Sequence, residues 1–118
     1  MTLKECYTAL GGNYADVLGR LGSERLVQKF VLKFLDDGSF ELLRRSLDAG
    51  DKDEAFRAAH TIKGMCQNLS FTKLADSDSQ ITESLRSGDL EGALSLFDTV
   101  REDYERTVNA IRAFQAEL

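Results

Sequence analysis

His60 is the only histidine in the chain, and its neighbours limit the chemistry that it can do. It lies in the segment AFRAAHTIKGMCQNLSF, residues 55–71, with Lys63 three positions and Gly64 four positions after it. No acidic residue stands three or four positions from His60, so the segment predicts neither an acid–base pair nor a metal site. A lone imidazole can still act as a nucleophile that takes up a group from another molecule.

The helical periodicity of this segment turns His60 away from its apolar side. At about 100° per residue, the apolar stripe of residues 52–69 consists of Ala55, Ala59, Ile62, Cys66 and Leu69. The sector around His60 contains Lys63, Gly64 and Gln67, with Phe56 and Arg57 at its edges. An ordinary surface histidine beside an ordinary surface lysine would give the same pattern.

Gly64 and Lys63 favour a functional interpretation of His60. A glycine inside a helix costs about 1 kcal/mol relative to alanine. Here it leaves space one turn from the imidazole, which suits a site that another macromolecule approaches closely. The Lys63 ammonium, with Arg57 nearby, disfavours the charged imidazolium and can partly neutralise a phosphoryl group carried by the ring.

Two further residues of this sector have less defined roles. Gln67 is two turns from His60 and can donate a hydrogen bond. Phe56 is an apolar side chain on a polar face, where it can serve as docking surface for a partner. Packing of Phe56 against a neighbouring helix is an equally good interpretation.

The composition excludes several classes of function. The chain has 118 residues, 42% of them hydrophobic and 30% charged, which is the balance of one soluble globular domain. The net charge of −5 disfavours binding to nucleic acid through a broad basic surface. There is no membrane-length apolar run, no signal-peptide pattern at the N-terminus and no glycine loop for ATP. We therefore expect a cytoplasmic protein without nucleic-acid or membrane partners, with Cys6 and Cys66 as reduced, buried thiols.

The absence of proline and the positions of the glycines predict an all-α protein. The chain contains no proline, and most glycines separate segments with helical periodicity. Helices are expected over residues 2–10, 13–21, 23–37, 39–49, 52–69, 71–87 and 90–116. The turns LDAGDKDEA and LRSGDLEGA each place a glycine after one helix and an aspartate before the next, which is typical of helical hairpins.

These helices are best buried as an antiparallel up-down four-helix bundle. Its members would be the segment 23–49 and the last three helices, so the core bundle covers about 23–116. The helices before residue 23 are expected as short additions at the N-terminus. We expect residues 1–118 to form a single domain.

The segment HTIKGMCQNLSFTKL, residues 60–74, resembles the signature of histidine-containing phosphotransfer (HPt) domains. The resemblance consists of the histidine, an apolar residue at +2, Lys-Gly at +3 and +4, and a leucine near +9. Individual residues match the family pattern over residues 47–90, whereas elsewhere only the expected arrangement of helices does. The resemblance implies a four-helix bundle with an exposed phosphoryl-accepting histidine, His60, with Lys63 as charge-neutralising neighbour and Gly64 as clearance for docking.

The chain departs from the family pattern at two positions. The family usually has glycine after the motif leucine, where this chain has Ser70; we expect this serine to cap the following helix. The family also often places Glu or Gln on the next helix near the histidine. By spacing, this chain has Thr82 there, with Gln80 close by, so the residue that orients the imidazole is left open.

The resemblance implies a phosphocarrier and not an enzyme with its own turnover. His60 would relay a phosphoryl group between receiver-domain aspartates, those of a hybrid histidine kinase and of a response regulator. Mg²⁺ would belong to the receiver, and no cofactor is expected on this chain, which we expect to be a monomer. Two alternatives are the histidine-bearing substrate module of a chemotaxis-type kinase and a non-catalytic helical adaptor that sequesters receivers.

Overall fold

The computed structural model describes all 118 residues, which form seven helices joined by short turns. In chain order these are α1 (Leu3–Leu10), α2 (Tyr14–Leu21), α3 (Glu24–Phe34), α4 (Ser39–Asp48), α5 (Lys52–Leu69), α6 (Thr72–Arg86) and α7 (Leu90–Gln115). The structure contains no strand, which confirms the predicted all-α class. No helix combines the length and the apolar character that crossing a membrane requires.

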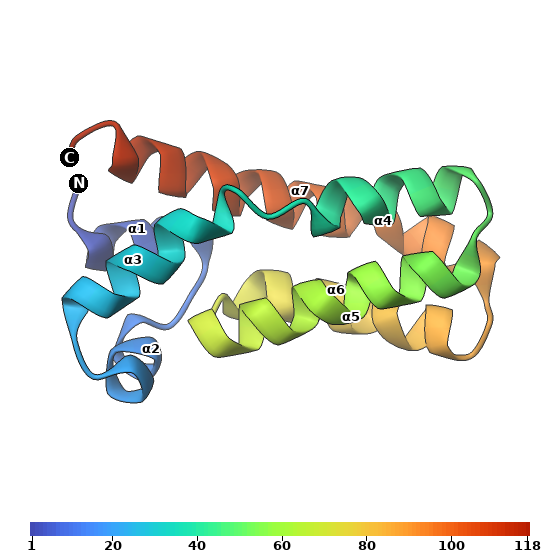
Figure 1. Cartoon of the computed structure of the whole chain (residues 1–118), viewed down its shortest axis with the longest axis horizontal. Helices are drawn as coiled ribbons and strands as arrows, with labels where there is room; N and C mark the ends of the chain where they lie inside the picture. Colours follow the sequence, from blue (N-terminus) through green and yellow to red (C-terminus); the bar gives the residue numbers. More distant parts are fainter.

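Helices α4 to α7 form an antiparallel bundle (Figure 1). Helix α5 packs against α4 and α6, and α6 packs in turn against α7. Helix α7 has 26 residues and extends past the other three along the 40 Å long axis of the molecule. Helix α1 packs against this extension, where the Cys6 thiol lies 3.5 Å from the Ala110 carbonyl oxygen. The long helix therefore joins the bundle to the N-terminal helices.

The segment 23–49 supplies the fourth member of the bundle as two separate helices. The chain leaves the helical path between α3 and α4, where the Asp37 carboxylate accepts a hydrogen bond from the Ser39 backbone N–H at 2.8 Å. Helix α4 fills the fourth position, whereas α3 lies beyond it with α1 and α2 (Figure 1). The predicted four-helix bundle with additional N-terminal helices is confirmed, and α3 belongs with the N-terminal group.

The two Gly-Asp turns form the predicted hairpins. Gly50 and Gly88 adopt left-handed backbone conformations, with φ of 69° and 79°, which glycine reaches without steric cost. Asp51 and Asp89 then cap α5 and α7, because each carboxylate accepts a hydrogen bond from a backbone N–H of the next helix, at 3.1 and 2.9 Å. The start of the helix that carries His60 is thus determined by a local sequence signal.

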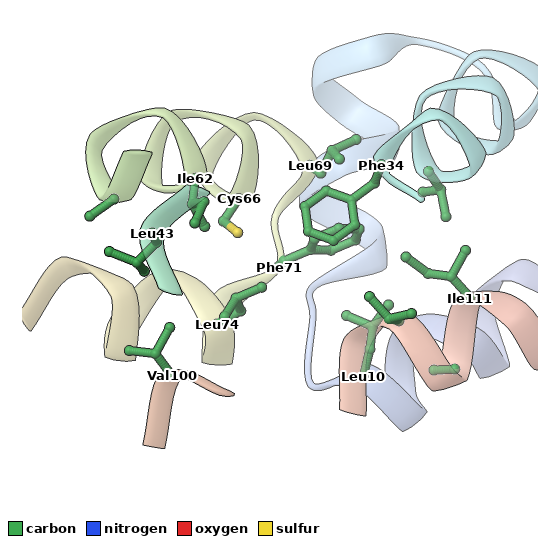
Figure 2. Packing of buried hydrophobic residues seen from close by; sticks show 14 of the residues in the cluster. Leu10, Phe34, Leu43, Ile62, Cys66, Leu69, Phe71, Leu74, Val100 and Ile111 are labelled. Atoms are coloured by element: carbon green, nitrogen blue, oxygen red, sulfur yellow. The ribbon is translucent and has the colours of Figure 1, made fainter. Parts of the chain in front are cut away.

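The core lies between the inward faces of these helices. Figure 2 shows Ile62 and Cys66 of α5 near Leu43 of α4, with Leu74 of α6 and Val100 of α7 on the facing side. The predicted apolar stripe of α5 is buried at all five positions: Ala55, Ala59, Ile62, Cys66 and Leu69. Burial of a side chain such as Ile62 contributes roughly 1.5–3 kcal/mol. Both cysteines are free and buried, as expected.

The turn between α5 and α6 is made without glycine. Ser70 adopts the left-handed conformation, with φ 57° and ψ 39°, as the C-cap of α5. Its hydroxyl donates a hydrogen bond to the Asp16 carboxylate at 2.6 Å and accepts one from Arg20 at 2.9 Å. Phe71 occupies the N-cap position of α6 and makes no side-chain cap. The expected capping role of Ser70 is therefore wrong, because α2 engages its hydroxyl.

The turn between α1 and α2 packs directly against this serine turn. The Asn13 N–H donates to the Ser70 carbonyl at 2.9 Å, and the Lys73 N–H donates to the Gly11 carbonyl at 3.0 Å. A Cβ atom on Gly12 would lie only 2.8 Å from the Ser70 carbonyl oxygen, so only glycine permits this approach. The N-terminal helices thereby fix one end of the α5–α6 hairpin.

Candidate functional site

His60 lies midway along α5 and is exposed, as the helical wheel predicted. The opposite side of the helix carries Ala55, Ala58 and Ala59, all buried. Small side chains at these positions let α5 approach its neighbours closely, and the packed helix holds the backbone of His60 in place. The imidazole is therefore presented to solvent by a rigid element of the bundle.

An aromatic contact engages the imidazole ring. The rings of Phe56 and His60, one helical turn apart, are nearly parallel at 11°, with 5.7 Å between centroids. The Arg86 guanidinium of α6 lies over the Phe56 ring, with its central carbon 4.9 Å from the centroid. Phe56 and Arg86 also line a shallow cavity of about 530 Å³ beside the site. Phe56 thus packs against α6 and contacts His60 with the same ring.

Glu83 connects Arg86 to Lys63. The Glu83 carboxylate accepts a hydrogen bond from the Arg86 Nε at 3.2 Å, and the Lys63 Nζ lies 3.9 Å from its other oxygen. The groups around His60 therefore form a series of contacts that runs from the imidazole through Phe56, Arg86 and Glu83 to Lys63. Because Glu83 is exposed, each ion pair contributes little to stability, about 0–1 kcal/mol. Their effect is on where the two cations lie.

Gly64 leaves open space beside the imidazole. A Cβ atom built at this position would have no neighbouring atom within 4 Å. Packing inside the protein therefore does not explain the absence of a side chain, and glycine is not required by its backbone, which is helical. The open position lies on the same exposed face as His60, one turn further along α5.

Arg57 and Gln67 take no part in the series of contacts that runs from His60 to Lys63. Arg57 forms an ion pair with Glu54, three residues earlier on α5, and its side chain is 71% exposed. Its charge is therefore balanced on the side away from Lys63. Gln67 is exposed two turns after His60. The structure assigns neither residue a contact with the imidazole.

Thr82, at the position where the family often has Glu or Gln, points into the core. It is fully buried, and its hydroxyl donates a hydrogen bond to the Asp78 backbone carbonyl at 2.8 Å and lies 3.3 Å from the Asp78 carboxylate. It cannot orient the imidazole from there. The neighbouring Gln80 is exposed on α6.

Asp78 is a buried carboxyl beneath the site. It is completely buried, and its Oδ1 atom has no hydrogen-bond partner. Burial raises the pKa of Asp78 to about 7, although the Thr82 hydroxyl and the Lys63 ammonium act in the opposite direction. Lys63, whose side chain is 24% exposed, thus lies between an exposed carboxylate, Glu83, and this buried one.

An apolar groove lies further along the exposed surface. It has a volume of about 420 Å³ and runs between α3 and the C-terminal part of α5, with Phe30, Lys33, Met65 and Asn68 among its lining residues. Phe30 is 36% exposed, and the Lys29 and Lys33 ammonium groups lie 5.9 and 5.8 Å from its ring centroid. Asp36 and Asp37 also line the groove, so it combines an exposed aromatic side chain with charges of both signs.

Sequence reasoning missed Glu83 and Arg86, although a signal for Arg86 was available. In an antiparallel hairpin centred on residue 71, Phe56 and Arg86 stand at equal distances from the turn. The spacing of Glu83 and Arg86, three residues apart, also favours an ion pair on a helix. Nowhere are three His, Cys, Asp or Glu side chains grouped so that they could hold a metal ion.

Comparison with protein families identifies this arrangement. The family model described as Hpt domain matches residues 25–110, which include all of α4, α5 and α6 and most of α3 and α7. Searches of the curated proteins and of the solved structures found no match. The matched region contains His60, Lys63, Gly64, Glu83 and Arg86.

Proposed function

The chain belongs to the Hpt domain family, and from this premise we propose that it relays a phosphoryl group between receiver-domain aspartates in a multistep two-component phosphorelay. Domains of this family are histidine-containing phosphocarriers that interact with receiver domains and have no turnover of their own. The observation that carries the proposal is the exposed His60 imidazole, followed one turn later on the same helix by Lys63 and by the open position at Gly64.

The transfer proposed at His60 is a nucleophilic substitution at phosphorus. A nitrogen of the neutral imidazole attacks the aspartyl phosphate of the donor receiver, a P–N bond forms, and the P–O bond breaks to release the aspartate as a carboxylate. The phosphorylated ring then carries a positive charge. An aspartate carboxylate of the second receiver attacks in its turn, the P–N bond breaks, and neutral imidazole is restored.

The residues of this chain supply position and charge. Helix α5 holds the nucleophile in place before the partner arrives, which removes part of the entropic cost of the reaction. Lys63 is proposed to partly neutralise the phosphoryl oxygens once the group is on the ring. The receiver is proposed to bring Mg²⁺ and the acidic pocket, so no cofactor is assigned to this chain.

Docking of the receiver is proposed over the face centred on His60. An interface of ordinary size covers about 800 Å² on each partner, which corresponds to a patch with a radius of roughly 16 Å. Asn68 at the edge of the α3–α5 groove is eight residues after His60, or about 12 Å along the helix. A receiver that uses the open position at Gly64 would thus also reach the groove. We propose a monomer in the cytoplasm as the acting form.

The direct test is transfer from a phosphorylated receiver. A panel of receiver domains, labelled with radioactive phosphate in the presence of Mg²⁺, is mixed with the wild-type chain and with His60→Gln. We expect rapid transfer of an acid-labile, base-stable label to the wild type and none to the variant. Because His60 is exposed, circular dichroism should show an unchanged fold in the variant.

Other outcomes would favour the alternatives. Equal receiver binding by both proteins without transfer to either would favour the adaptor that sequesters receivers. Label that arrives only from a kinase with bound ATP, and from no receiver, would favour the substrate module of a chemotaxis-type kinase. Absence of both binding and transfer would contradict the relay.

A further inference from the structure

We infer that Phe56, held in place by Arg86, orients the His60 imidazole for phosphoryl transfer. The inference rests on the proposed function and deepens it, because it assigns the positioning of the nucleophile to an aromatic contact. Phe56 and Arg86 are positioning residues in this account. The group that accepts phosphate remains the imidazole.

The geometry of the two rings supports this role. Phe56 precedes His60 by one turn, and the 11° angle and 5.7 Å centroid distance describe an offset parallel pair. The lone pair of an imidazole nitrogen lies in the plane of the ring, so the nucleophile is presented at the ring edge. A phenyl ring against one face therefore restricts rotation of the imidazole and leaves that edge free for in-line attack.

Arg86 fixes the position of the Phe56 ring. Its guanidinium carbon lies 4.9 Å from the ring centroid, which is within the range of a cation–π contact. The guanidinium is itself held by Glu83, whose two carboxylate oxygens lie 3.2 and 3.3 Å from the Arg86 Nε. Helix α6 thus orients the imidazole indirectly, through Arg86 and the phenyl ring. Thr82 of the same helix makes no hydrogen bond to the imidazole, because its hydroxyl donates to the Asp78 carbonyl in the core.

The same arrangement determines where charge lies around the ring. Glu83 lies between two cations, the guanidinium of Arg86 and the ammonium of Lys63. Arg86 is directed toward the phenyl ring, whereas Lys63 is three residues after His60 on its own helix. Lys63 is therefore the cation available to a phosphoryl group at the ring edge, while Arg86 holds the Phe56 ring against the imidazole.

The first test measures the stack in the free protein. In ¹H–¹³C NMR spectra the imidazole C–H protons of the wild type should show ring-current shifts away from their values in Phe56→Leu. Phe56→Tyr should keep those shifts, and Arg86→Gln should reduce them. Identical imidazole shifts in the wild type and Phe56→Leu would overturn the inference, whatever the fate of the relay.

The second test separates positioning from docking. Single-turnover transfer from a phosphorylated receiver is followed as a function of receiver concentration, which gives a saturating rate and a half-saturating concentration. Phe56→Leu should lower the saturating rate roughly two- to tenfold, the range expected for loss of an aromatic pair, with little change in the half-saturating concentration. Phe56→Tyr should restore the rate.

Arg101→Gln is the matched control for Arg86→Gln. Arg101 also forms an ion pair with an acidic residue three positions away on its helix, but it lies on α7 and contacts no aromatic ring of the site. Arg86→Gln should lower the saturating rate and Arg101→Gln should not. A rise in the half-saturating concentration at an unchanged saturating rate in Phe56→Leu would instead make Phe56 a docking residue and contradict positioning. If the wild type accepts no label from any receiver, the proposed function itself fails. The NMR spectra separate this failure from a failure of the inference, because they report the Phe56–His60 contact in the free protein.

Discussion

The outer and inner faces of the α5–α6 hairpin both carry an acidic residue, but the two residues differ in exposure to solvent and in their partners. On the outer face, Glu83 is exposed and pairs with Arg86 and Lys63. On the inner face, Asp78 is buried with one carboxylate oxygen unpaired and only Thr82 as a hydrogen-bond partner. Two acidic residues five positions apart on one helix therefore differ in the free-energy penalty that the fold places on the charged carboxylate.

The difference follows from solvation. Water stabilises an exposed carboxylate whether or not it is paired, so the outer ion pairs can break and re-form when a partner arrives. A buried carboxylate without full pairing has lost its hydration, and its charged form is penalised. The outer face is thus suited to chemistry that moves charge, whereas the inner face makes the stability of the fold depend on pH.

The largest expected effect is on stability and comes from Asp78. Its pKa in the fold is about 7 against an ordinary value of 3.8, so between these values the folded protein keeps a proton that the unfolded chain loses. The free energy of unfolding should therefore fall as pH rises from 4 to 7, by up to about 4 kcal/mol at 1.36 kcal/mol per unit. Urea unfolding across this pH range measures it.

Asp78→Asn should remove most of this pH dependence. Asp76→Asn, an exposed position on the same helix, is the matched control for the loss of one negative charge and should keep it. A wild-type stability that stays constant or rises between pH 4 and 7, with no difference in Asp78→Asn, would show that the buried carboxyl does not penalise the folded state.

Lys63 joins the two faces, and its loss should slow transfer. Lys63→Ala removes the ammonium proposed to lie next to the phosphoryl group, and loss of a charge-assisted hydrogen bond of about 1.5–3 kcal/mol corresponds to roughly 10- to 160-fold in rate. The measurement is the saturating rate of single-turnover transfer. The variant should also raise the pKa of Asp78 further, because a favourable charge is removed. Unchanged transfer kinetics would remove the role assigned to Lys63.

Gly64 allows a test of the outer face alone. Gly64→Gln fills the open space beside His60, so receiver affinity measured by calorimetry should fall by about tenfold, or 1.4 kcal/mol. Gly64→Ala is a useful companion, because replacing a helical glycine should raise the free energy of unfolding by about 1 kcal/mol. Undiminished affinity in Gly64→Gln would show that the gap is not used in docking.

The smallest effect is expected for Glu83. Glu83→Gln is the same chemical change as Asp78→Asn on the same helix, but at an exposed position whose ion pairs contribute little. The free energy of unfolding at pH 7 should change by less than about 1 kcal/mol. A loss as large as that expected from buried groups would contradict the distinction between the two faces.

Much of the fold and part of the site could be predicted because they depend on local patterns. The burial of Ile62 and the exposure of His60 follow from the period of one helix, and the hairpins at Gly50 and Gly88 follow from turn chemistry. The signature around His60 likewise consists of neighbours on one helix. The family match over residues 25–110 is consistent with that resemblance.

Other features required the packed structure. Ser70 was expected to cap α6, but it ends α5 in a left-handed conformation, and its hydroxyl contacts Asp16 and Arg20 of α2, 50 or more residues away. The ion pair of Arg57 with Glu54 was also not predicted. Side chains with several rotamers choose among partners by the charges within reach, and periodicity does not specify which partner is closest.

By itself, then, the sequence determined the seven helical segments, the outward direction of His60 and the glycine-aspartate hairpins, because each depends on backbone preferences and the period of a single helix. The tertiary structure decided that α4 and not α3 completes the bundle, that Arg86 lies over Phe56, and that Asp78 is enclosed without a full set of partners. These outcomes depend on how two helices are placed against each other. Burial and partner choice are properties of that placement, which no single segment encodes.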